Sequence, residues 1–131
     1  MKTASLQLNL VIAWLWLLLG FVTGMVLGLF FHREDWLGGY ASFKRRMYRL
    51  AHISFFGLGA ANLLFWLTAK SFSNLTLPVT GASWAFIAGA VSMPLCCVLM
   101  AHCPKLRLIF AVPVVSLIMG GLLTLLEVIK L

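Results

Sequence analysis

The chain has 131 residues, of which 63% are hydrophobic and 10% are charged, and its formal net charge is +7. So few charged side chains cannot cover the surface of a water-soluble domain, in which they normally make up about 25% of the residues. The composition therefore excludes an ordinary soluble domain. We attribute the positive charge to membrane topology rather than to nucleic-acid binding.

Four long apolar stretches occupy most of the chain. They are Leu10–Phe31, Leu50–Ala69, Ala82–Ala101 and Leu108–Ile129. A helix needs roughly 20 residues of this kind to cross the hydrocarbon core of a bilayer, and each stretch is about that long. Because the apolar runs are continuous and do not alternate, they exclude a transmembrane β-barrel. We expect a single domain, residues 1–131, folded as an all-α bundle of four transmembrane helices with short loops.

Small residues mark one face of the first stretch. Gly20, Gly24 and Gly28 follow one another at intervals of four, the spacing of the GxxxG packing motif. Glycines at this spacing let a second backbone approach closely, so we expect this face to pack against a helix of this chain or of another subunit. A flat cofactor or a lipid tail is the alternative occupant. Gly57 and Gly59 make the middle of the second stretch thin in the same way.

Basic residues gather in two of the three connections. The first connection and the start of the second stretch contain Arg33, Lys44, Arg45, Arg46 and Arg49. We expect these side chains to contact anionic lipid headgroups. The third connection adds Lys105 and Arg107, whereas the opposite side has only Lys2, Lys70 and Lys130. The positive-inside rule then places the first and third connections in the cytoplasm and both termini outside. We expect the protein in the inner membrane of a bacterium.

All three histidines lie at the same end of the expected bundle. His32 follows the first stretch, His52 opens the second and His102 follows the third. Imidazoles from different helices at equal depth can clamp a haem b or line a quinone site. Our candidate cofactor-binding residues are therefore His52, His102 and His32, together with Asn62 in the second stretch. The alternatives are hydrated histidines at the membrane interface and an interhelical hydrogen bond from Asn62. The pattern identifies no one cofactor and no metal, although it would suit haem b.

A proline interrupts the third stretch. Pro94 has no N–H group, so the carbonyl of Ala90 loses its helical partner and we expect a kink there. Pro104 should end this helix shortly after His102.

No pattern predicts catalysis by this chain alone, because it shows no nucleophile–base pair, no paired inward carboxylates and no phosphate-binding glycine loop. The leading interpretation is a small polytopic membrane subunit or accessory protein. It would pack within a larger complex, against other subunits or against its own copies in a homo-oligomer. The first alternative is an electron-transfer subunit that binds haem b or a quinone through cytoplasmic-side histidines, and so could belong to a redox enzyme complex. The second is a small four-helix transporter or channel, for which a carboxylate at mid-depth is missing.

Overall fold

The computed structural model describes residues 2–131, with side chains from Ala4 onward. The described residues contain helices and no strand, and four of the helices are long and apolar enough to span a membrane. The long helices are α1 (Lys2–Phe30), α2 (Phe43–Ala69), α3 (Leu77–His102) and α4 (Ala111–Val128). Two 3-10 segments, η1 (Trp36–Gly38) and η2 (Pro104–Phe110), lie in the connections. The predicted all-α class is confirmed.

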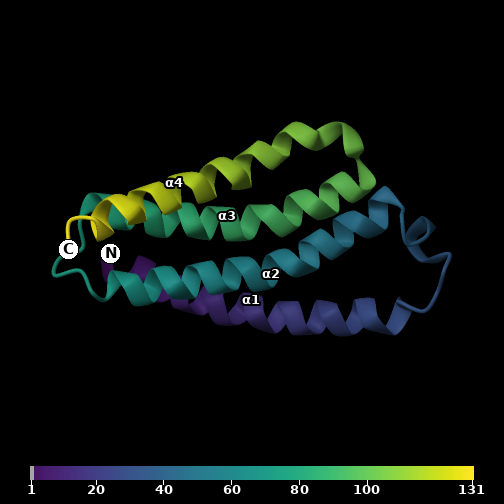
Figure 1. Cartoon of the computed structure of the whole chain (residues 1–131), viewed down its shortest axis with the longest axis horizontal. Coiled ribbons are helices and arrows are strands. Elements are labelled where there is room, and N and C mark those ends of the chain that lie inside the picture. Colours follow the sequence, from purple (N-terminus) through teal and green to yellow (C-terminus); the bar gives the residue numbers. More distant parts are fainter. Residues whose placement is uncertain (1) are drawn as a thin grey trace.

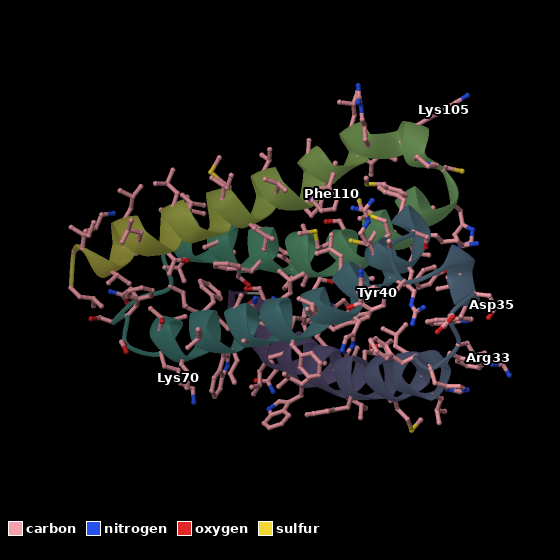
Figure 2. All side chains as sticks on the ribbon, turned by 45° about the vertical axis from the view of Figure 1, so that its right-hand side comes forward. Arg33, Asp35, Tyr40, Lys70, Lys105 and Phe110 are labelled. Atoms are coloured by element: carbon pink, nitrogen blue, oxygen red, sulfur yellow. The ribbon has the colours of Figure 1, made fainter. Side chains whose placement is uncertain are left out.

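The four helices pack in chain order (Figure 1). Helix α2 packs against α1 and α3, α3 packs against α4, and a shorter contact joins α1 to α3. Both ends of the chain lie near the α2–α3 connection, at what we call the terminal end. Residues 31–42 and 103–110 lie at the opposite end, which we call the basic end. The labelled side chains of Arg33 and Lys105 project outward at the basic end (Figure 2).

Three helices begin earlier than their apolar stretches. Helix α1 begins at Lys2 rather than Leu10, and its early polar residues Ser5 and Asn9 are buried against the other helices. Helix α2 begins at Phe43 rather than Leu50, because Ser42 caps it by accepting a hydrogen bond from the N–H of Arg45. The basic segment before the second stretch is therefore the first two turns of a long helix.

The start of α3 follows the same rule. It begins at Leu77 rather than Ala82, with the hydroxyl of Thr76 accepting from the N–H of Val79. Pro78 lies in the first turn, where the missing N–H costs no helical hydrogen bond. At its other end α3 stops at His102, just before Pro104, as predicted.

Helix α4 is an edge helix that packs on α3 along a narrow stripe. It begins at Ala111 rather than Leu108, because the residues before it form η2. Its buried residues are Pro113, Gly120 and Glu127, which follow one another at intervals of seven. Near the terminal end, Glu127 accepts a hydrogen bond from Thr76 at 3.2 Å and pairs with Lys130 at 2.6 Å. The rest of the helix surface is largely exposed and apolar.

A buried polar cluster fastens the other three helices to one another near the terminal end. Asn9 of α1, Asn62 of α2 and Ser83 of α3 are fully buried. The amide of Asn9 donates to Oδ1 of Asn62 at 2.8 Å, and the hydroxyl of Ser83 donates to Oδ1 of Asn9. Such interhelical hydrogen bonds hold helices together in apolar surroundings. The interhelical bond expected as one alternative for Asn62 is present.

Candidate functional site

A cavity of about 550 Å³ lies between α1, α2 and α3 on the basic-end side of the polar cluster. Its volume is within the range of roughly 300–1,000 Å³ that ligand pockets occupy. Its walls are mostly apolar. The lining residues are Trp16, Thr23, Val26 and Leu27 of α1, Tyr48, Ala51, His52 and Phe55 of α2, and Val91, Pro94, Leu95 and Val98 of α3. Val26, Val91, Leu95 and Val98 are exposed, so the cavity opens sideways between α1 and α3.

The contacts between α1 and α3 explain where this cavity begins. The two helices meet at Asn9 and Ser83, and again where the indole N–H of Trp16 donates to the carbonyl of Ala90 at 2.9 Å. This is the carbonyl that Pro94 leaves without a helical partner. The predicted free carbonyl therefore exists, and a tryptophan on another helix supplies its donor. Trp16 and Pro94 both line the cavity beyond this contact.

His52 is the half-buried imidazole of the cavity wall. Its Nδ1 lies 3.0 Å from Oγ1 of Thr23. The hydroxyl of Thr23 has a single proton, which it donates to the carbonyl of Leu19 at 2.7 Å. We therefore assign a proton to Nδ1 of His52 as the donor to Thr23, so that Nε2 is the acceptor whenever the ring carries one proton.

The ring of His52 is also held by its packing. It meets the ring of Phe56 edge-on, with centroids 5.4 Å apart. On its other side is Gly24, where an added Cβ would lie 2.8 Å from Cε1 of the imidazole. A side chain at position 24 would therefore displace the ring. The predicted glycine face thus positions a histidine.

Tyr48 is a second polar side chain in the cavity wall, one turn before His52 on α2. Its phenolic oxygen lies 2.9 Å from Nε2 of His102, and the two rings meet edge-on. His102 itself is exposed at the end of α3. The cavity wall therefore presents two polar groups one turn apart, and each is fixed by a side chain of a different helix.

The structure separates the predicted cofactor-binding residues. His52 lines the cavity, His102 contacts it only through Tyr48, and His32 is exposed beyond the end of α1. The imidazoles of His52 and His102 do not face each other across the cavity. Asn62 also lies elsewhere, because its amide donates to the carbonyl of Leu58 and its oxygen accepts from Asn9. Within residues 2–131, no group of three or more His, Cys, Asp or Glu side chains could hold a metal.

The predicted packing glycines divide into two groups. An added Cβ would lie 2.8 Å from the Phe56 ring at Gly20 and 3.1 Å from the Ala13 carbonyl at Gly59, so both glycines are at the contact between α1 and α2. Gly28 and Gly57 differ from the prediction, since no atom lies within 4 Å of an added Cβ at either position. Helices α1 and α2 separate toward the basic end (Figure 1), and Gly28 lies two residues before the last residue of α1.

Arg45 departs from the expected headgroup contact. It is only 2% exposed, and its guanidinium donates to the carbonyls of Phe31 at 2.9 Å and Arg33 at 3.2 Å. The rings of Phe31, Trp36 and Tyr40 surround it at 5.3–5.5 Å. Carbonyls that follow the end of a helix have no intrahelical donors, and Arg45 supplies donors to two of them just after α1 ends at Phe30. The other four basic residues are exposed or half-buried: Arg33, Lys44, Arg46 and Arg49.

Comparison of the chain with protein-family models, with curated proteins and with solved structures finds no match in any of the three.

Proposed function

We propose that this protein binds a lipid-soluble molecule with a polar ring, of the quinone type, in the cavity between α1, α2 and α3. One observation carries the proposal: Tyr48 and His52 stand one turn apart in the wall of a mostly apolar cavity that opens sideways. A molecule dissolved in the hydrocarbon of a bilayer could enter between α1 and α3 without crossing water.

The two polar groups offer complementary hydrogen bonds. Nε2 of His52 is an acceptor in the assigned tautomer, and the hydroxyl of Tyr48 can donate or accept. A quinol hydroxyl can donate to the imidazole, and a quinone or methoxy oxygen can accept from the phenol. Phe55 and the aliphatic walls supply apolar contact for the ring and its tail. Few, fixed polar groups in an apolar pocket are typical of small-molecule sites.

The proposal retains the expectation of a small membrane subunit. The chain would hold the ring-headed molecule, and another subunit would supply any electron transfer with it. We also propose that the four helices span a bacterial inner membrane with the basic end in the cytoplasm. The basic residues at that end, Arg46 and Lys105 among them, support this orientation.

The direct test is a binding titration on the whole chain in nanodiscs. Short-chain ubiquinone and menaquinone analogues, oxidised and reduced, would be titrated by calorimetry. We expect His52→Leu to weaken binding by about tenfold, the loss of roughly one hydrogen bond. His32→Leu is the matched control, because His32 is exposed and outside the cavity. Val91→Trp should block the opening, whereas Val112→Trp on α4 should not.

Three results would contradict the proposal. Equal binding by His52→Leu and His32→Leu would remove the imidazole from the site. A reduced-minus-oxidised spectrum with a haem signal that disappears in His52→Leu would assign the cavity to haem b instead. Absence of any quinone binding, with partner proteins retained in stoichiometric amount, would leave a purely structural subunit.

A further inference from the structure

A second, smaller cavity lies on the other side of His52. Its volume is about 300 Å³, and it lies between α1 and α2 toward the basic end. Its lining residues are Gly24, Leu27 and Gly28 of α1, Phe31 just after α1, and Arg49, His52 and Ile53 of α2. Gly28 is exposed with no atom near its missing side chain, which leaves the helix backbone uncovered there. The cavity thus combines an apolar wall with one permanently charged side chain.

Arg49 has unused hydrogen-bonding capacity at this cavity. Its one hydrogen bond is a long contact of 3.5 Å to the carbonyl of Tyr40, whose ring it covers at 4.3 Å. A guanidinium has five N–H donors, so most of them have no acceptor in the described chain. In the described residues the one ion pair is Glu127–Lys130, at the terminal end, so the charge of Arg49 is not neutralised by a carboxylate.

We propose that this second cavity binds one anionic phospholipid. The phosphate would lie against Arg49, and an acyl chain would run over the uncovered backbone at Gly28 and past Leu27 and Ile53. The charge selects an anion, and guanidinium–phosphate contacts are among the stronger hydrogen bonds in proteins. The apolar walls select a lipid over a free phosphate ion, which would leave them without contact. This proposal does not depend on the proposed ligand of the larger cavity.

The chain supplies a matched control for each half of this site. Arg46 is on the same helix as Arg49, is exposed, and does not line the cavity. Gly57 resembles Gly28 in having open space around a new side chain, but it does not line the cavity. Arg49→Gln and Arg46→Gln therefore remove the same charge, and Gly28→Leu and Gly57→Leu add the same bulk, at different places.

The experiment measures lipid retention by native mass spectrometry of the whole chain released from nanodiscs of phosphatidylglycerol and phosphatidylcholine in equal amounts. We expect one retained phosphatidylglycerol per chain, with its preference over phosphatidylcholine lowered about tenfold by Arg49→Gln. Gly28→Leu should abolish retention of either lipid, and the two control variants should behave as the unchanged chain does.

Three results would overturn the proposal. Equal loss in Arg46→Gln and Arg49→Gln would mean diffuse attraction by the basic end. Full retention in Gly28→Leu would mean that no acyl chain occupies the cavity. Displacement of the lipid by millimolar inorganic phosphate alone would mean a simple anion site. Thermal melting of each variant in detergent establishes that it is folded before its lipids are counted.

Discussion

Trp16 of α1 and Pro94 of α3 together determine the hydrogen bond that the carbonyl of Ala90 accepts. Proline leaves the carbonyl of Ala90 without its usual donor, and a carbonyl in hydrocarbon without a donor costs several kcal/mol. The indole N–H of Trp16 occupies that position at 2.9 Å. An otherwise unfavourable proline is thereby tolerated inside α3, and α1 is tied to α3 at the edge of the larger cavity.

This arrangement predicts a coupling between the two residues. Replacing Pro94 with Ala restores an N–H at position 94, so the carbonyl of Ala90 no longer depends on Trp16. We expect Trp16→Phe to cost about 1 kcal/mol more of the free energy of unfolding in the original chain than in the Pro94→Ala background. Unfolding in mixed micelles measures the cost of Trp16→Phe in both backgrounds. Trp14→Phe, at an exposed position on the same helix, is the control. Equal costs in the two backgrounds would disprove the coupling.

The sequence indicates individual residues better than it indicates their partners. Asn62, His52 and the carbonyl of Ala90 are recognisable because polar groups and prolines are conspicuous in apolar helices. Their partners Asn9, Thr23 and Trp16 could not be found in that way. Which residues meet depends on how far each helix is rotated and where the helices cross, and the hydropathy of one helix contains neither quantity. For the same reason, similar depth did not indicate that His52 lines the cavity and His102 does not.

A buried cation, Arg45, holds the chain in place just after the end of α1. Arg45 lies in the first turns of α2, yet its guanidinium serves the carbonyls of Phe31 and Arg33. The aromatic rings around it exclude water and add cation–π attraction. The connection between the two helices is therefore anchored at its start by a residue that follows it in the chain.

Loss of this anchor should loosen the first connection. We expect Arg45→Gln to speed amide hydrogen exchange of residues 31–42 by about tenfold, since hydrogen bonds from a charged donor are lost. Arg46→Gln changes the same charge at an exposed neighbouring position and should leave exchange unchanged. Mass-spectrometric exchange in nanodiscs resolves these peptides. Identical exchange in the two variants would show that Arg45 does not hold the connection.

At the scale of elements, the existence of all four long helices is predictable and their first residues are not. Hydropathy is low over the basic residues before Leu50, so the hydropathy pattern predicts that α2 begins at Leu50. The helix begins where Ser42 can cap it, and its basic first turns are held by contacts to the preceding connection. Likewise, Ser5 and Asn9 extend α1 because they are buried against neighbouring helices. Tertiary contacts, absent from a local pattern, decide these boundaries.

In the molecule as a whole, the helices are joined by buried hydrogen bonds near the terminal end and lie farther apart toward the basic end (Figure 1). The polar cluster of Asn9, Asn62 and Ser83 lies near the terminal end, and both cavities lie toward the basic end. Hydrogen bonds between helices resist separation where they occur, and the helices diverge beyond them. On the side where ligands are proposed to bind, the polar contacts join helices in pairs, Thr23 with His52 and Tyr48 with His102, rather than three helices at once.

The proposed orientation of the whole molecule can be tested with cysteine labelling. Cys103 is exposed at the basic end. In intact cells we expect a membrane-impermeant maleimide to leave Cys103 unlabelled, and to label it after the cells are opened. Ser73→Cys in a Cys103→Ser background should label in intact cells, because residue 73 is exposed at the opposite end. The reverse pattern would invert the topology.

His52 lines both cavities, so a ligand in either one contacts the same imidazole. Where one ligand changes the position or hydrogen bonding of that ring, the two ligands are thermodynamically linked, and each changes the affinity of the other by the same factor. The phospholipid composition of the bilayer would then act as an allosteric effector of the ring-headed ligand. Gly24 allows the imidazole to occupy this shared position, because a Cβ at residue 24 would lie 2.8 Å from its Cε1.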